Sequence, residues 1–459
     1  MDASNILADN IAGITIKDIP REVVDITKKC ILDTFGCILA GSGLSQDSKN
    51  VIDLFIEAGG NEESTVIGFD KKLPSWSAAF ANGVLAHALD YDDIVDEAGV
   101  HPTLCTVPAT FALAEKRGGV TGKEFIAAVA LGNDLICRLG SAIKRKQEGL
   151  TLGFRPAPVL GVFGAAAAAG KILKLDREQI VDAIGIAFHQ AAAGTFEVFL
   201  SPGDPKIREL YGGSIGMQAT LAALMAQRGV TGIKTSFEGS AGLFNLYFQG
   251  KYDRDYLLGD LGTRFDGLNV GLKAWSANRI MHNHVQAALE LTREHGINPA
   301  DIEQITLYVT EIQKRYAGEE RKKPATSTEA RISLPFCVGA AIVNKGLGIR
   351  SFTSDGLSDT ATLMLAQKIV AEDISYGEVK SFFAPGKVSI KIKSGEVFIK
   401  QIDFPFGHPH NPMSLEDAVN KFKDCAQYSE SPGQAAHILK TLNKLETIKD
   451  VREITGSFQ

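Results

Sequence analysis

Two histidines and three aspartates lie close together in one short stretch of the chain. The residues are His87-Ala88-Leu89-Asp90-Tyr91-Asp92-Asp93, and His101-Pro102-Thr103 follows shortly after them. Apolar runs with helical spacing flank this stretch, at residues 78–89 and 106–115. Carboxylates beside an imidazole orient it and stabilise its charged form, which suits general acid–base chemistry near neutral pH. The stretch is therefore a candidate site of proton transfer.

An ordinary structural explanation of the same stretch also stays open. Asp93 could cap the following helix in a solvated loop, with His101 as a surface histidine. Charged side chains are rarely buried without partners, however, so their concentration between two apolar helices favours the wall of a pocket. On that interpretation we expect His101 and Asp93 to be catalytic and Asp92 to contact the substrate.

Positively charged residues occur where apolar helical runs meet loops. They are Arg155, Arg208, Lys273 and Arg279. Arg155 precedes an alanine-rich helix, where a guanidinium and free backbone amides together suit a carboxylate. Lys273 follows an apolar residue, and a lysine partly removed from water can serve as a base or as a partner for a carboxylate. Arg155 alone would more often be a surface arginine, and Arg208 could equally be a surface charge beside a helix. The set of four cations nevertheless suits a small polycarboxylate substrate.

The overall composition narrows the classes of partner. The 459 residues carry a net charge of −6, which argues against nucleic acid and means that any anion must be bound by a local group of cations. Residues 1–5 lack the features of a signal peptide, and the most apolar run, 156–172, is shorter than the roughly 18 residues of a membrane span. We expect a cytoplasmic protein with no membrane partner.

The sequence contains no motif for a bound cofactor or metal. The six cysteines are scattered through apolar runs without zinc or iron–sulfur spacing, so we expect reduced core residues. No P-loop, dinucleotide fingerprint or nucleophile elbow is present, and the glycines at 161–170 lie inside a helical run. The expectation is an enzyme without cofactor or metal.

The elements that must position these residues are of two kinds. Up to about residue 261 one helix follows another, and their alanine and glycine content predicts closely packed helices. Later, residues 302–310 alternate as a strand, and residues 387–393 and 396–402 predict a hairpin with a Ser-Gly turn. The expected helices are 21–40, 77–89, 106–117, 123–143, 162–173, 177–194, 214–227, 257–261, 279–294, 334–344, 358–370 and 415–425. We predict a mainly α protein with a large helical domain (1–267), a smaller α+β domain (268–404) and C-terminal helices (405–459).

The opening stretch also carries a family resemblance. Asn82-Gly83, the residues from His87 to Asp93, His101-Pro102-Thr103 and Pro108 together resemble the signature of the MmgE/PrpD family. That family includes 2-methylcitrate dehydratases, cis-aconitate decarboxylase and iminodisuccinate epimerase. The resemblance implies an all-helical domain that the C-terminal helices rejoin after a smaller, lid-like α+β domain. It also implies a cofactor-independent enzyme for a small polycarboxylate, and a homodimer.

The same resemblance assigns roles outside the opening stretch. Arg208 matches a family lysine or arginine and looks like an anion-binding residue. The stretch from Lys273 to His282 resembles a family segment of the form Lys-x-aromatic-Pro-x-Cys/His-Arg-x-x-His. Lys273 and Arg279 match it, and Asn278 replaces the usual cysteine or histidine. We expect Lys273 to be catalytic, and Asn278, Arg279 and His282 to contact the substrate.

Two further departures from the family pattern bear on the reaction. Arg155 stands where many members have a catalytic histidine, and Phe336 where a tyrosine often touches the substrate. We expect both residues to contact the substrate. Fewer general acids should impair the elimination of hydroxide more than proton transfer alone.

Four candidate functions therefore remain open. The family resemblance favours a dehydratase-type lyase similar to 2-methylcitrate dehydratase. The missing acids favour an isomerase or epimerase of the iminodisuccinate type, and a cis-aconitate-type decarboxylase is a further alternative. The non-enzymatic alternative is an oligomeric scaffold whose pocket has lost its activity.

Overall fold

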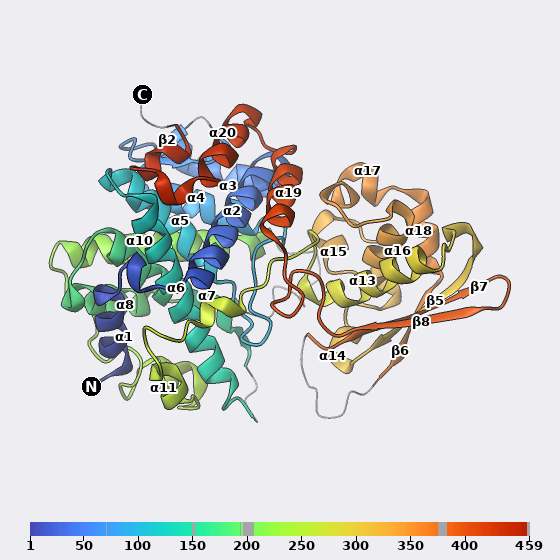
Figure 1. The fold of residues 1–459 in the computed structure, drawn as a ribbon, viewed down its shortest axis with the longest axis horizontal. Helices are drawn as coiled ribbons and strands as arrows, with labels where there is room; N and C mark the ends of the chain where they lie inside the picture. The colour runs from blue at the N-terminus through green and yellow to red at the C-terminus, as the bar shows by residue number, and fades with distance from the viewer. Residues whose placement is uncertain (70, 149–151, 193, 196–205, 375–382, 457–459) are drawn as a thin grey trace. The chain divides into compact units, whose positions relative to one another are not determined.

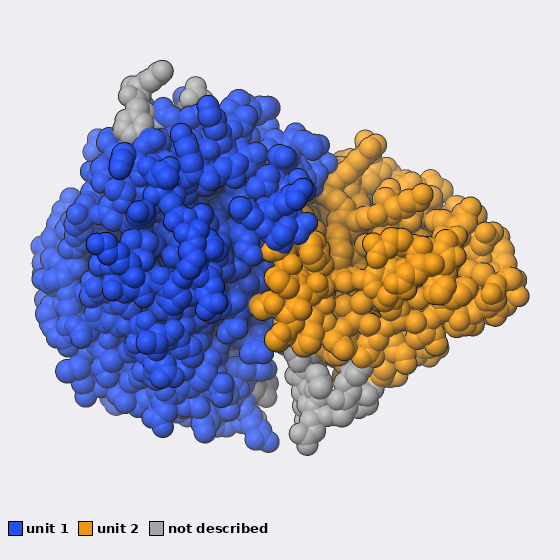
Figure 2. All heavy atoms as spheres, viewed as in Figure 1, with its two compact units in different colours: residues 1–88, 92–272, 414–459 blue, residues 89–91, 273–413 orange. Residues whose placement is uncertain are grey.

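The computed structural model describes residues 1–69, 71–148, 152–192, 194–195, 206–374 and 383–456. They form two compact units, which Figure 2 distinguishes by colour. Unit 1 comprises residues 1–88, 92–272 and 414–459, and unit 2 comprises residues 89–91 and 273–413. The corresponding boundaries expected from the sequence are residues 267 and 404.

Unit 1 is almost entirely helical (Figure 1). Its α-helices are α1 (Ala3–Gly13), α2 (Arg21–Leu44), α3 (Gln46–Ala58), α4 (Ser75–His87), α5 (Pro102–Arg117), α6 (Gly122–Lys144), α7 (Pro156–Ile172), α8 (Arg177–Gln190), α10 (Leu210–Gln227), α11 (Leu243–Phe248), α12 (Arg254–Leu258), α19 (Leu415–Ala426) and α20 (Pro432–Leu442). Two short antiparallel ladders pair β1 (Ser64–Val66) with β2 (Lys71–Leu73) and β3 (Phe154–Arg155) with β4 (Gly194–Thr195). The 3-10 helix η2 (Lys206–Glu209) leads directly into α10.

Small residues set the distance between helices in unit 1. A Cβ atom at Gly132 of α6 would lie 2.7 Å from the carbonyl oxygen of Gly164 in α7, and one at Gly164 would lie 2.3 Å from that of Gly132. Side chains larger than hydrogen would push these axes apart, so the predicted close packing is confirmed. Gly41 was expected to end its helix, but α2 continues to Leu44. A Cβ there would lie 2.4 Å from the carbonyl oxygen of Leu85, so this glycine serves the contact with α4.

Helix α6 is both long and apolar in composition. Among the described residues it is the helix long and apolar enough to cross a membrane, at 23 residues. Its apolar window is completely buried inside the structure, as in the central helix of a globular domain.

Unit 2 combines helices with one mixed sheet (Figure 1). The helices are α13 (Arg279–Glu294), α14 (Glu311–Lys314), α15 (Ser327–Arg331), α16 (Leu334–Asn344), α17 (Ser354–Leu357) and α18 (Thr360–Gln367), and the strands are β5 (Ile302–Val309), β6 (Ile369–Asp373), β7 (Gly386–Ile392) and β8 (Val397–Ile402). The sheet order is β6-β5-β7-β8, with β5 and β6 parallel and the other pairs antiparallel. Helices α13 and α16 pack together, and α13 also covers β7 and β8. The predicted hairpin and the mainly α fold with a smaller α+β part are confirmed.

One predicted element of unit 2 was wrong in part. The helix expected at 358–370 ends at Gln367, and Ile369 and Val370 belong to strand β6. A short apolar run does not distinguish a buried helix turn from a buried strand, because both place apolar side chains in the core.

Candidate active site

Close packing of two helices positions the first side chains of the site. A Cβ atom at Gly83 of α4 would lie 2.4 Å from the carbonyl oxygen of Gly212 in α10, and one at Gly212 would lie 2.4 Å from that of Gly83. His87 lies one turn after Gly83, at the end of α4, and Tyr211 immediately precedes Gly212. The two rings consequently meet edge to face, with their centroids 4.6 Å apart.

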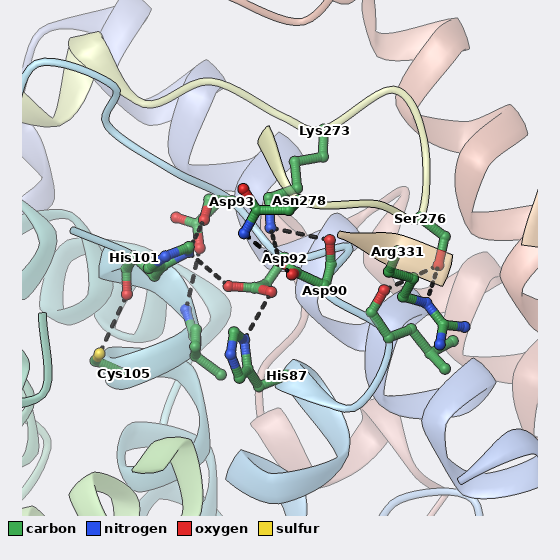
Figure 3. A network of polar contacts seen from close by, with 12 residues as sticks. His87, Asp90, Asp92, Asp93, His101, Cys105, Lys273, Ser276, Asn278 and Arg331 are labelled. Atoms are coloured by element: carbon green, nitrogen blue, oxygen red, sulfur yellow. Dashed lines mark hydrogen bonds and ion pairs between the residues drawn. The ribbon is translucent and has the colours of Figure 1, made fainter. Parts of the chain in front are cut away.

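The carboxylate of Asp92 lies between two imidazole rings (Figure 3). Its Oδ1 is 2.9 Å from Nδ1 of His87, and its Oδ2 is 2.7 Å from Nδ1 of His101. The side chain of Asp92 is completely buried, and that of His87 is nearly so. A buried carboxylate needs partners that compensate for its lost hydration. The N–H of His87 donates a hydrogen bond to Oδ1, and the ring of His101 lies at ion-pair distance from Oδ2.

The tautomer of His101 follows from its neighbours. Nδ1 also lies 2.7 Å from the backbone carbonyl oxygen of Asp93, which can only accept a hydrogen bond. Nδ1 therefore carries the hydrogen, and Nε2 is the basic nitrogen of the neutral ring. The side chain is 11% exposed, so part of the ring is accessible from solvent. Asp92 stabilises the imidazolium that forms when Nε2 takes up a proton.

Asp93 has a different task from Asp92. Its carboxylate accepts hydrogen bonds from the amides of Thr103, at 2.9 Å, and Leu104, at 3.3 Å, and so satisfies the start of α5. Pro102 at the first position explains why α5 begins earlier than the predicted residue 106. Burial raises the pKa of Asp93, although the hydrogen bonds from Thr103 oppose that rise. The capping alternative is correct for this side chain, but the loop is buried, and the backbone of Asp93 orients His101.

Tyr211 connects these histidines with Arg155. The guanidinium carbon of Arg155 lies 4.7 Å from the centre of the Tyr211 ring, at cation–π distance. Antiparallel pairing of Arg155 with Gly194 holds the backbone at this point. The expected free amides of α7 are largely missing, because its first and third residues are Pro156 and Pro158. Arg155 therefore presents its side-chain cation rather than a helix terminus.

Arg208 lies in η2 and is almost fully buried, with 6% of its surface exposed. The neighbouring Glu209 accepts hydrogen bonds through Oε2 from Ser45, at 3.0 Å, and Ser48, at 2.9 Å. Ser45 also caps α3. These hydrogen bonds hold the 3-10 turn that contains Arg208. Because the guanidinium is buried, Arg208 is not the surface charge considered above as an alternative.

Lys273 is the centre of a second group of polar residues, which belongs to unit 2. Its Nζ donates to Oδ1 of Asp90 at 2.6 Å and to the carbonyl oxygen of Asp90 at 2.9 Å, and its surface is 1% exposed (Figure 3). Asp90 has a left-handed backbone, with φ of 51°, a conformation that aspartate tolerates better than most residues. The ion pair with the carboxylate of Asp90 favours a cationic role for Lys273 over that of a base.

Asn278 and Ser276 complete this group. Asn278 donates from Nδ2 to Oδ2 of Asp90 at 3.3 Å, and its Oδ1 accepts from the amide of Ile280 to cap α13. Ser276 donates to the carbonyl oxygen of Leu89, and the Nε of Arg331 donates to Ser276 at 3.3 Å (Figure 3). Asn278 thus contributes a neutral amide to this group.

The remaining candidates lie on α13 and α16. Arg279 is the first residue of α13 and is 3% exposed. His282 lies 3.2 Å from the carbonyl oxygen of Ala277 through Nε2, whereas His284 points to β5 and donates from Nε2 to Tyr308 at 3.0 Å. The two histidines therefore face different sides of the helix. Phe336 is completely buried within the hydrophobic core of unit 2, where its ring lies 6.2 Å from that of Phe352.

The cysteines do not add a reactive group to the site. All six are buried and free, which confirms the expected reduced core residues. Cys105 donates from Sγ to the carbonyl oxygen of His101, and burial raises the pKa of its thiol well above the usual value. Within the described ranges, no three His, Cys, Asp or Glu side chains are arranged to hold a metal ion.

Sequence reasoning missed three residues of these two groups. His87 and Asp90 were part of the opening stretch without an assigned role, and Tyr211 was part of the segment after Arg208. Asp90 carried only the signal of the opening stretch as a whole, since residue types do not show that Asp90 belongs to unit 2 and Asp92 to unit 1. Tyr211 had no such signal, because only the contact between α4 and α10 brings it to His87.

Comparisons with known proteins cover nearly the whole chain. The model of the MmgE/PrpD N-terminal domain matches residues 5–255, and that of the MmgE/PrpD C-terminal domain matches residues 275–447. The chain is 27% identical to the cis-aconitate decarboxylase of Mus musculus, over 98% of this chain and 91% of that one. It is 27% identical to the Homo sapiens cis-aconitate decarboxylase, over 98% and 92%, and 24% identical to that of Aspergillus terreus, over 96% and 92%.

Proposed function

Because the chain belongs to the MmgE/PrpD family, we propose that it is a lyase that acts on a small tricarboxylate through proton transfer at carbon. The observation that carries the proposal is the pair of contacts at Nδ1 of His101, with Asp92 and with the backbone of Asp93. They leave Nε2 as the nitrogen that exchanges a proton with the substrate.

Decarboxylation of a cis-aconitate-type substrate is the reaction to test first. The curated relatives named above are cis-aconitate decarboxylases, and they align with this chain over almost its full length. In such a reaction the bond to one carboxylate breaks, carbon dioxide leaves, and the electron pair remains on carbon. The imidazolium of His101 then delivers a proton from Nε2 to that carbon. Asp92 stabilises the imidazolium before the transfer, so the acid is ready when the charge develops.

Cationic side chains supply the charge that a tricarboxylate requires. Arg155 and Arg208 are proposed to bind its carboxylates, since a guanidinium forms paired hydrogen bonds with a carboxylate. Lys273 is proposed to act as an ammonium that stabilises negative charge, because it forms an ion pair with the carboxylate of Asp90.

Dehydration, which the sequence analysis favoured, is the second candidate. It would use the same base at His101, but it also needs an acid for the departing hydroxyl group. The ammonium of Lys273 is a donor of that kind, so dehydration also has a candidate acid among these residues. An epimerase needs a second base, and the contacts of Lys273 with Asp90 disfavour it in that role.

Incubation with a panel of polycarboxylates in deuterium oxide tests the proposal. Cis-aconitate, citrate, 2-methylcitrate and iminodisuccinate would be followed by proton NMR and by carbon dioxide release, with His101→Asn as the matched control. Loss of carbon dioxide supports decarboxylation, and loss of water supports dehydration. Deuterium incorporation without a new compound indicates proton-transfer chemistry alone, and no reaction with any substrate indicates the scaffold.

A further inference from the structure

One carboxylate serves two imidazoles in unit 1, and only one of them has a role in the proposed reaction. Nδ1 of His87 lies 2.9 Å from Oδ1 of Asp92, and Nδ1 of His101 lies 2.7 Å from Oδ2. The ring centroids of the two histidines are 5.7 Å apart. All three side chains are largely withdrawn from water, with the carboxylate at 0% exposure. Charge on any one of them is therefore felt strongly by the other two.

The hydrogen bond from His87 acts on His101 through the carboxylate. An N–H donated to Oδ1 partly satisfies the negative charge of Asp92, so less of that charge stabilises an imidazolium at Oδ2. A second positive charge on His87 would additionally repel one on His101. Both effects favour the neutral form of His101, which has a free pair of electrons at Nε2.

We propose that His87 is a positioning residue that shares Asp92 with His101 and thereby sets the pH at which His101 changes between its acid and base forms. The inference rests on the proposed function of His101. In the proton-transfer step, the substrate proton binds Nε2 of His101 or leaves it, the C–H electron pair stays with carbon, and Nδ1 keeps its hydrogen. Asp92 remains ionised throughout, and His87 holds its Oδ1 so that Oδ2 stays directed at His101.

Other groups of unit 1 also act on this pair of histidines. Tyr211 of α10 lies against both rings, Arg155 lies over Tyr211, and Asp93 lies at the start of α5. Cys105 contacts the backbone of His101. The buried ion pair of Asp33 in α2 with Lys421 in α19 adds a compensated charge, and Asp92 and Asp93 both act to raise the pKa of Asp33. These groups are the same in every variant compared, so differences between variants report the change at residue 87.

The experiment follows the titration of His101 directly. The imidazole resonances of His101 are recorded by NMR against pH in the wild type, His87→Phe and His87→Asn, and assigned with His101→Asn. His87→Phe keeps a ring against Tyr211 but has no N–H. His87→Asn places an amide N–H close to the position of Nδ1. We expect His87→Phe to raise the titration midpoint of His101 by about one pH unit, and His87→Asn to restore at least about half of that shift.

The kinetic readout separates positioning from folding. For the tricarboxylate that the enzyme converts, the pH profile of kcat should move with the NMR midpoint, while KM changes by less than about threefold. An unchanged midpoint in folded His87→Phe would overturn the inference, and so would an equal shift in His87→Asn. If His87→Phe does not fold, His87→Leu takes its place. A shift in the NMR midpoint without turnover of any substrate would refute the proposed function, whereas turnover with an unshifted profile would refute the role of His87.

Discussion

The backbone carbonyl oxygen of Asp93 accepts a hydrogen bond from Nδ1 of His101, while the carboxylate of the same residue caps α5. One residue thus fixes both the ring and the helix that begins just after it. Since the acceptor for the ring is a backbone atom, substitution of Asp93 leaves it in place. The consequences of changing Asp93 and His101 should therefore differ in kind.

His101→Asn should abolish most of the activity. The variant keeps a polar side chain but loses the basic Nε2, so we expect kcat to fall by about 100-fold or more, with KM little changed. Steady-state kinetics on the substrate identified in the panel would measure this, with circular dichroism to check folding. Turnover near the wild-type rate would contradict a catalytic role for His101 and indicate that residues 87–103 serve the structure.

Asp93→Ala should act mainly on stability. It leaves two amides of α5 without their acceptor, and the loss of a helix cap typically costs about 0.5–2 kcal/mol of unfolding free energy. Asp93→Asn keeps one acceptor oxygen and should lose less. Urea denaturation of both variants, together with kcat, tests this expectation. A fall in kcat as large as that of His101→Asn, at unchanged stability, would indicate direct participation of the carboxylate.

Arg208→Ala should weaken substrate binding. Loss of one charge-assisted contact of about 1.5–3 kcal/mol corresponds to a rise in KM of roughly 10- to 100-fold. Arg208→Lys is the matched variant, because it keeps the positive charge but loses the planar guanidinium that binds a carboxylate through two hydrogen bonds. Its KM should lie between those of the wild type and Arg208→Ala. An unchanged KM in Arg208→Ala would mean that this guanidinium stabilises the fold around η2 rather than the substrate.

His284 should make the protein less stable in mild acid. Burial lowers its pKa from 6.5 to about 4. Between these values the unfolded chain binds a proton that the folded chain does not, so the unfolding free energy falls as the pH drops from about 6.5 to about 4. The full effect of such a shift is about 3 kcal/mol. Urea unfolding at several pH values should show this loss in the wild type and not in His284→Gln, whose amide can still donate to Tyr308. An equal pH dependence in both proteins would contradict the assignment.

Phe336→Tyr distinguishes a core residue from a substrate contact. Its hydroxyl would enter the hydrophobic core of unit 2, and a buried polar group without a partner costs about 1–3 kcal/mol. We expect lower stability in urea denaturation and no gain in kcat. A gain in kcat at unchanged stability would show that the hydroxyl reaches the substrate, as the family resemblance suggested for this position.

The sequence predicted the regular elements of unit 2 better than the details of the site. The bounds of α13 were predicted correctly, because apolar residues recur with helical spacing behind the cap at Asn278. The hairpin was predicted because Ser394-Gly395 separates two alternating runs, and Gly395 has the positive φ that such a turn favours. In both cases the determining interactions are local in sequence.

The site depends on contacts that are not local. The sequence indicated that the stretch from His87 to His101 is a candidate site of proton transfer. It did not predict that His87 and His101 share Asp92, because residue types do not tell which carboxylate faces which ring. The ion pair of Asp90 with Lys273 joins residues 183 positions apart. Helical periodicity and strand alternation describe local contacts, so they do not predict a pairing over this distance in sequence. Only the tertiary structure shows it.

The contact of Gly83 with Gly212 limits how this protein can change over evolution. Each position already has the smallest side chain, so a larger residue at either one cannot be compensated by a smaller residue at the other. Repair would require α4 and α10 to separate along their length, which would move His87 away from Tyr211. Neither glycine is therefore expected to tolerate a larger side chain.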